Sequence, residues 1–369
     1  MERIWIAGPC AAESREQLLA TAEQLAEQTR EKGLSLQYFR AGAWKVRSAP
    51  DSFAGAGEAA LPWLQEVQNS YHIPACVEVM TAKQVELCAK YDIRVVWVGA
   101  RTSVNPVEVQ QIADAVKHTD FTVMVKNPMI PDLKLWMGNI ERFLQVDIRR
   151  VMAIHRGFPD VQENIYRNAP FWHIPIELKV QMPDLPILCD PSHLCGKVEW
   201  IPEVAQLAMN YGFNGLMVEC HCHPEQALSD AAQQMLPSDW AEMISRLDLR
   251  NDSADLELVK QRSTLENIDN QISTLLYQRM KMVDEIAEIK RKNHISVVQP
   301  QQWQQVVERY EKNKEDSDYQ LFIKRFLQLL HQSSIDRQKY TFRMIRRAET
   351  PRDYFATLDL DPCASQLGL

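Results

Sequence analysis

The feature that most constrains this chain is a regular alternation of short, β-rich apolar runs with amphipathic segments between residues 4 and 249. Helical stretches such as 13–32, 82–91 and 202–211 separate the runs, which occupy residues 4–7, 36–39, 75–79, 95–98, 122–125, 151–154, 187–188 and 215–218. This alternation is typical of repeated βα units around a parallel sheet. Eight units in about 250 residues predict a (β/α)8 TIM barrel, with a doubly wound α/β sheet as the alternative.

The sequence changes character after residue 250. Residues 251–349 contain no glycine and almost no β-rich runs, so we expect an all-α domain of three helices at 255–291, 300–312 and 318–347. We place the barrel at 1–250, a linker at 251–254, the helical domain at 255–347 and a C-terminal tail at 348–369. The first helix would be roughly 55 Å long, which favours packing against a second chain. Its apolar stripe consists of Leu265, Ile268, Ile272, Leu275, Val283, Ile286 and Ile289.

Charge and composition exclude several kinds of partner. The 41 basic and 49 acidic side chains give a net charge of -8, which offers no overall attraction to nucleic acid or to an anionic membrane. The apolar run at the N-terminus is too short for a signal peptide, and no stretch approaches the ~20 apolar residues of a membrane span. The eight scattered cysteines do not form the pattern of a disulfide framework. We therefore expect a cytoplasmic protein with reduced thiols.

Cationic side chains follow many of the predicted strands. In a TIM barrel the carboxyl ends of the strands converge on one mouth, where active sites lie. Six cations in a net-acidic protein are costly at one mouth unless anions fill the site. The pattern therefore predicts a site for a polyanionic substrate, formed by Arg40, Lys45, Arg47, Arg101, Lys126 and Arg156.

A mixed set of metal-binding side chains accompanies these cations. Cys10, His193, Glu219 and Asp230 offer a thiolate, an imidazole and two carboxylates, which together suit one divalent metal ion. The tract 219–223 also invites a zinc-site interpretation. Strand alternation, however, points its acidic residue and histidines one way and its cysteines the other, so this tract alone forms no tetrahedral cage.

The motifs of the barrel half resemble those of the compact, type I-beta-like 3-deoxy-D-arabino-heptulosonate 7-phosphate (DAHP) synthases. The resemblance spans residues 4 to 249 and rests on Gly8-Pro9-Cys10, Lys45-Val46-Arg47-Ser48, Gly99-Ala100-Arg101, Asp190-Pro191-Ser192-His193, Val218-Glu219 and Ala227-Leu228-Ser229-Asp230. It implies condensation of phosphoenolpyruvate with erythrose 4-phosphate. It also implies a divalent metal, Mn²⁺ above others, on the four ligands named above.

The same resemblance assigns roles to the cations. It implies that Arg101, Lys126 and Arg156 hold the phosphate of phosphoenolpyruvate, with Arg40 and Lys45 near its carboxylate. Lys45 is also the expected proton shuttle. Arg47 and Ser48 would bind the phosphate of erythrose 4-phosphate, and Asp190 is expected in the substrate site. Two motifs depart from the family: Lys45-Val46-Arg47-Ser48 replaces Lys-Pro-Arg-Thr, and Lys126-Asn127-Pro128 replaces Lys-Arg-Gly.

Polar residues in the helical half form a second candidate site. Arg279 and Lys290 are eleven residues apart, which puts them on one helix face about 16 Å apart along the axis. Arg262 lies roughly 25 Å before Arg279 and about 100° round the helix, so it would serve the site of another protomer. Ser334 and Gln338 share a face of the third helix.

Residues 255–340 resemble the all-helical chorismate mutases, which form intertwined dimers. Arg262, Arg279, Lys290, Ser334 and Gln338 fall on that family's substrate positions. The resemblance implies rearrangement of chorismate to prephenate in a homodimer. Arg279 and the partner's Arg262 would clamp the two carboxylates, while Lys290 and Gln338 would donate to the ether oxygen. The family's Asp-x-x-Arg-Glu is replaced by Gln299, Gln302 and Trp303, which removes one arginine and one carboxylate.

Three interpretations of the fusion remain open from the sequence. Two activities of one pathway on one chain suggest feedback, in which prephenate or chorismate bound to the helical domain inhibits the synthase. Alternatively, the helical domain is a non-catalytic sensor and dimerisation arm, as the changes at Gln302 and Trp303 suggest. The third interpretation is a metal-dependent hydrolase barrel with an inert helical module, prompted by the histidines at 221 and 223.

Overall fold

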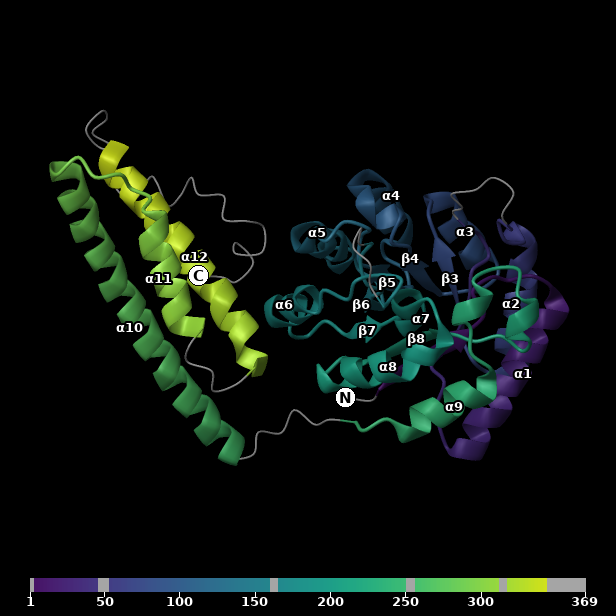
Figure 1. Ribbon diagram of the computed structural model, residues 1–369. Coiled ribbons are helices and arrows are strands. Elements are labelled where there is room, and N and C mark those ends of the chain that lie inside the picture. The colour runs from purple at the N-terminus through teal and green to yellow at the C-terminus, as the bar shows by residue number, and fades with distance from the viewer. Residues whose placement is uncertain (1–2, 46–52, 160–164, 250–255, 312–316, 344–369) are drawn as a thin grey trace. The chain divides into compact units, whose positions relative to one another are not determined.

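The computed structural model describes residues 3–45, 53–159, 165–249, 256–311 and 317–343. The chain divides into two compact units, Met1–Asp252 and Ser253–Leu369 (Figure 1). Each unit is described by itself below.

The first unit is a closed barrel of eight parallel strands in the order β1 to β8. Strand β1 pairs with β8 in the register Ile4↔Gly215 to Gly8↔Glu219, which closes the sheet. This closure confirms the predicted TIM barrel and excludes the doubly wound sheet, which has open edges. The strands are β1 (Ile4–Gly8), β2 (Tyr38–Ala41), β3 (Ala75–Val79), β4 (Val95–Val98), β5 (Thr122–Lys126), β6 (Arg150–His155), β7 (Ile187–Cys189) and β8 (Gly215–Glu219).

Alternating strand residues build two apolar layers. Residues such as Ile6, Trp97 and Met217 fill the inside of the barrel, whereas Ala7 and Val218 face the surrounding helices. Side-chain caps fix where several helices begin; Ser14, for example, accepts a hydrogen bond from the backbone of α1. The helices are α1 (Arg15–Lys32), α2 (Ala60–Tyr71), α3 (Ala82–Lys90), α4 (Pro106–Val116), α5 (Leu133–Leu144), α6 (His173–Gln181), α7 (Pro191–Cys195), α8 (Ile201–Asn210) and α9 (Pro237–Arg246).

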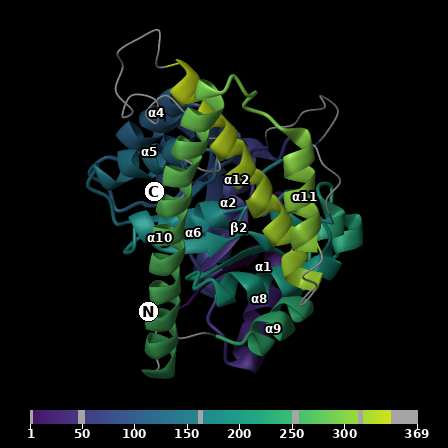
Figure 2. The same cartoon turned by 60° about the vertical axis from the view of Figure 1, so that its left-hand side comes forward.

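The second unit is helical, as predicted. It consists of α10 (Leu256–Lys292), α11 (Pro300–Glu311) and α12 (Ser317–Arg343), and α12 packs along α10 (Figure 2). The last expected turn of α12 and the tail lie outside the described residues. Of the predicted stripe, only Val283 is buried, while Leu265 is 58% and Leu275 62% exposed. The first half of α10 therefore carries an uncovered apolar surface.

Among the described helices, none combines the length and the apolar composition that crossing a bilayer needs.

Candidate active site

A buried network of acids and cations occupies the carboxyl ends of the barrel strands. Lys126, at the end of β5, donates to Asp190 Oδ2 at 2.6 Å. Arg40, on β2, donates to Glu219 Oε1 at 2.8 Å, and its Nη1 lies 3.9 Å from Asp190 Oδ2. All four residues are buried. The structure thus brings together two of the predicted cations and two of the predicted acids, from four different strands.

The electrostatics keep both acids ionised. Burial alone would raise the pKa of Asp190, but His193, Lys126 and Arg40 hold this pKa well below its usual range. Burial opposes ionisation of Glu219 in the same way, and His193 with Arg40 lowers its pKa overall. Burial lowers the pKa of Lys126, and the nearby Asp190 acts against this effect. The buried cations Arg40 and Lys126 therefore depend on the two ionised carboxylates to remain charged without water.

The four predicted metal ligands form two close pairs. Cys10 Sγ lies 3.3 Å from Asp230 Oδ2, and His193 Nε2 lies 3.6 Å from Glu219 Oε1. Asp190 Oδ2 lies 2.8 Å from His193 Nδ1 and leaves Nε2 facing Glu219. A carboxylate behind the imidazole is the usual outer-shell arrangement of a metal-binding histidine. The chemistry of this donor set therefore fits a divalent metal ion.

Two cations contact this donor set, and burial favours the protonated form of its thiol. Burial, followed by the charge of Glu219, raises the pKa of the Cys10 thiol to about 12. The Lys45 Nζ lies 3.2 Å from Cys10 Sγ, while Arg40 holds Glu219. In the described part of the chain, no three His, Cys, Asp or Glu side chains are placed to hold a metal ion without rearrangement. Metal binding would require release of the thiol proton and of these contacts.

The remaining predicted cations of the barrel differ in placement. Arg156 is buried, and burial, with Arg167 and Arg101 nearby, lowers its pKa to about 10. Arg101 is exposed at the end of β4. Arg47 and Ser48 lie outside the described residues. Asn127, one of the departures noted above, accepts from the Arg156 backbone at 2.7 Å and so joins the ends of β5 and β6.

The helical unit brings two of its predicted site residues into contact. Arg279 Nη1 donates to Ser334 Oγ at 2.7 Å, across α10 and α12. Lys290 Nζ donates to the carbonyl of Val297 at 2.7 Å. Gln338 is 7% exposed, and its Oε1 has no hydrogen-bond partner among the described residues. Arg262 is exposed on α10. The structure therefore leaves a buried acceptor on α12, one turn after the serine that Arg279 contacts.

The comparisons with known families cover both units. The model of the DAHP synthetase I family matches residues 2–250. The chain belongs to this family. The model of the chorismate mutase type II family matches residues 261–339, after the barrel. The predicted succession of a DAHP synthase region and a chorismate mutase region is confirmed, and with it the combination of a transferase family with an isomerase family.

Individual relatives show how far the similarity reaches. A phospho-2-dehydro-3-deoxyheptonate aldolase of Thermotoga maritima is 29% identical over 230 residues, which cover 62% of this chain and 64% of that relative. This chain thus spans just under two thirds of that relative's length. A 2-dehydro-3-deoxyphosphooctonate aldolase of Alkalilimnicola ehrlichii is 25% identical over 64% of this chain and 84% of its own. The crystal structure of a DAHP synthase from Thermotoga maritima superposes with a TM-score of 0.57 at 27% identity, covering 65% of this chain and 67% of that one.

Sequence reasoning missed two residues that join the parts of the DAHP synthetase I site. Arg167 Nη1 donates to Asp230 Oδ1 at 2.9 Å and to Gln233 Oε1 at 2.8 Å, and Gln233 in turn donates to Glu219. Asn168 Nδ2 donates to the His193 carbonyl at 2.6 Å. These contacts link three of the proposed metal ligands through one loop.

The same loop also reaches the proposed phosphate cations. Asn168 Oδ1 accepts from Arg156 Nη1 at 2.9 Å. Gly196 makes room for the stem of Arg167, because a Cβ there would lie 2.6 Å from Arg167 Cβ, and its φ of +74° favours glycine. Arg167 and Asn168 lie more than ten positions after the end of β6, so an analysis of the strand ends alone does not find them.

Proposed function

We propose that the barrel catalyses the metal-dependent, aldol-like condensation of phosphoenolpyruvate with D-erythrose 4-phosphate to DAHP and phosphate. The observation that carries this proposal is the set of buried cations around Asp190 and Glu219 in a member of the DAHP synthetase I family. Lys126, Arg156 and the exposed Arg101 would hold the phosphate of phosphoenolpyruvate. Arg40 and Lys45 would lie at the carboxylate of phosphoenolpyruvate, and Arg47 and Ser48 at the phosphate of erythrose 4-phosphate. Asp190 completes the substrate-binding set and holds Lys126.

The metal of this reaction would bind Cys10, His193, Glu219 and Asp230. We propose Mn²⁺, because a set of one sulfur, one nitrogen and two oxygen donors suits a divalent transition metal. When bound, such an ion supplies Lewis-acid polarisation of the aldehyde oxygen.

The chain itself would position the substrates and move one proton. Cations that hold both anionic substrates bring C3 of phosphoenolpyruvate onto the aldehyde carbon. Burial opposes protonation of Lys45, but the carboxylates of Glu78 and Glu219 act against this effect and the pKa of Lys45 is raised, so this lysine carries a proton at neutral pH. Its Nζ would give that proton to the aldehyde oxygen as this becomes a hydroxyl. Water then adds at C2, and the adduct expels phosphate.

We further propose that the helical unit converts chorismate to prephenate. This rearrangement is internal to the substrate and needs a shaped, charged pocket rather than a nucleophile or a base. Arg279 and Arg262 of a second copy would clamp the two carboxylates. Lys290 and Gln338 would donate to the ether oxygen, with Ser334 holding Arg279 in place. The buried Oε1 of Gln338 has no partner among the described residues, so it could accept a hydrogen bond from a ligand while the amide nitrogen donates.

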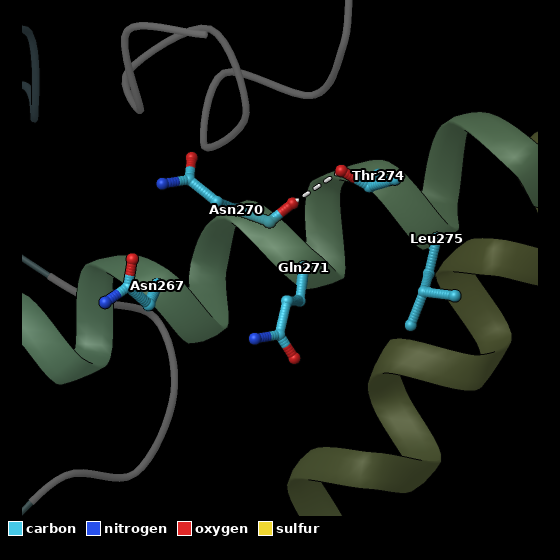
Figure 3. A pocket seen from close by; sticks show the side chains of 5 residues that line it. All are labelled: Asn267, Asn270, Gln271, Thr274 and Leu275. Carbon is cyan, nitrogen blue, oxygen red and sulfur yellow. Dashed lines mark hydrogen bonds between the residues drawn. The ribbon is translucent and has the colours of Figure 1, made fainter.

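The helical unit would also form the homodimer. The uncovered stripe on the first half of α10 includes Leu265, Ile268, Ile272 and Leu275, each more than 40% exposed. A contiguous apolar surface of this kind is typical of a protein interface. A shallow pocket at the same part of α10 is lined by the five side chains that Figure 3 shows: Asn267, Asn270, Gln271, Thr274 and Leu275. The exposed Arg262 lies on this part of the helix, as delivery to a partner's site requires.

Regulation and location complete the proposal. Prephenate or chorismate bound to the helical unit would inhibit the condensation, and an unchanged condensation rate at saturating prephenate would exclude this control.

We propose a cytoplasmic location, which agrees with the unbridged state of the seven cysteines in the described ranges. The protein would act without nucleic acid or membrane partners. The alternative, a helical sensor without turnover, rests on the changes at Gln302 and Trp303.

Two assays on the purified full-length chain test these functions. The first follows loss of phosphoenolpyruvate with erythrose 4-phosphate, and separately with arabinose 5-phosphate. The second substrate is needed because some relatives are named for an eight-carbon product, which requires a five-carbon aldose phosphate. We expect turnover with the four-carbon substrate only. The second assay follows chorismate loss, whose absence would favour the sensor.

A further inference from the structure

An aromatic pair stands beside the proposed mutase site and has no role in it so far. The indole of Trp303 on α11 stacks on the imidazole of His331 on α12, with ring centroids 3.8 Å apart and planes inclined by 14°. Both side chains are half-buried. Trp303 is also one of the positions where the chain departs from the mutase motif. The stack therefore places a titratable ring beside one of the positions at which this chain lacks the charged residues of the mutase motif.

His331 shares a helix face with two proposed site residues. Ser334 and Gln338 follow it by three and seven positions, which are neighbouring positions on one face of a helix. Arg279 Nη1 reaches Ser334 Oγ at 2.7 Å and lies 3.5 Å from the carbonyl of Leu330, on either side of His331 in the sequence. The imidazole of His331 therefore lies on the part of α12 that Arg279 contacts, close enough for the charge of the guanidinium to act on it.

Two cations face His331, and no acid among the described side chains offsets them there. Burial lowers the pKa of His331, and Arg279 and Lys290 of α10 lower it further. Helix α11 contributes the uncharged Trp303. Nearby acids are engaged elsewhere: Asp284 holds Arg337 through two hydrogen bonds, and Asp336 accepts from Lys339. These surroundings therefore disfavour the protonated ring in the ligand-free chain.

We propose that His331, held by Trp303, is a substrate-contacting residue of the mutase site and takes up a proton when a dicarboxylate binds beside Arg279 and Lys290. This inference rests on the proposed mutase function. A dianionic ligand cancels the two positive charges that disfavour the imidazolium. His331 then supplies a cation in the bound state, which offsets the arginine missing at Gln302.

The sign of the resulting pH dependence follows from linkage. Since the ligand raises the pKa of His331, it binds the protonated protein more tightly. Affinity is greatest below the pKa of the free protein, weakens as pH rises through it, and levels off above the pKa of the complex. Each unit between the two pKa values changes the dissociation constant about tenfold.

Isothermal titration of the full-length chain with prephenate tests the proposal. Parallel titrations in two buffers of different ionisation enthalpy, across pH 5 to 8, count the protons taken up. We expect uptake in the wild type and none in His331→Gln, with a KM for chorismate raised about tenfold and independent of pH. Trp303→Phe should raise KM while uptake persists, because the ring is loosened but still present. Ser333→Ala, which removes only a hydroxyl bonded to the Leu329 carbonyl of α12 itself, should match the wild type in both measurements.

The outcomes separate this inference from the proposed function. If the wild type neither binds prephenate nor consumes chorismate, the mutase function falls and this inference with it. If the wild type turns over chorismate but His331→Gln retains the same proton uptake, the inference alone is overturned. A purely structural role of His331 would change stability without changing the proton count, and circular dichroism of each variant verifies that the helices are intact.

Discussion

The buried pair of Lys126 and Asp190 offers a test of how the barrel site is held together. We consider Asp190→Asn, which keeps the shape of the side chain and its ability to cap α7 but removes its charge. Lys126 Nζ donates to this carboxylate at 2.6 Å, and both side chains are buried. The substitution leaves Lys126 without an anionic partner at a site whose desolvation already lowers its pKa.

The expected loss of stability is large. Removing one member of a buried ion pair costs about 3–5 kcal/mol, because the other charge stays buried. In a domain of this size, each kcal/mol corresponds to about 2–4 °C, so the barrel should melt roughly 6–20 °C lower. Adding Lys126→Met removes the stranded cation and should recover at least half of the loss, since no buried charge is then left without its partner.

Tryptophan fluorescence measures this effect selectively. Of the nine tryptophans, all except Trp303 precede residue 250, so the signal reports mainly on the barrel. Urea and thermal unfolding of the wild type, the single variant and the double variant give the three stabilities. The reasoning is refuted if Asp190→Asn stays within about 1 kcal/mol of the wild type, or if the double variant is less stable than the single one.

The remaining predictions concern the loop, the mutase site and the dimer. Arg167→Met should weaken divalent-metal binding about 10- to 100-fold in competition with a chromogenic chelator, because Asp230 loses its outer-shell partner; equal affinity would exclude this role. Arg279→Ala should lower mutase kcat/KM about 10²- to 10³-fold while condensation persists, and a parallel fall in both activities would contradict separate sites. Leu265→Glu should yield monomers in analytical ultracentrifugation that have lost mutase turnover, because Arg262 can no longer reach a partner; active monomers would disprove the shared site.

Much of the fold could be predicted because its signals are local. Each of the eight β-rich runs became a strand, and the barrel closed because the order of βα units leaves few other arrangements. The spacing of the apolar residues predicted the long helix, since α10 starts and ends one residue from the expected bounds. The spacing of the stripe does not predict its exposure; only the length of the helix pointed to a second chain. Periodicity reports that a face is apolar, and cannot tell whether the same chain or another one covers it.

Part of the site could likewise be predicted from the sequence, and part depends on contacts between distant segments. Arg40, Lys126 and Glu219 follow from the rule that strand ends meet at the mouth of a barrel. Arg167 and Asn168 do not, because a long loop folds them back onto α7, and only three-dimensional contacts show it. His331 was missed for a related reason. Its meaning depends on Trp303 from another helix, which the sequence presented only as a departure from a motif.

The central claim is that Cys10, His193, Glu219 and Asp230 gather into one metal centre. Titration of the full-length chain with Co²⁺ tests it directly, because cobalt bound to a thiolate gives a charge-transfer band in the near ultraviolet. We predict a band that saturates at one ion per chain, disappears in Cys10→Ser and persists in Cys222→Ser, which carries the thiol of the neighbouring His-rich tract. A band that survives in Cys10→Ser and vanishes in Cys222→Ser would contradict the account.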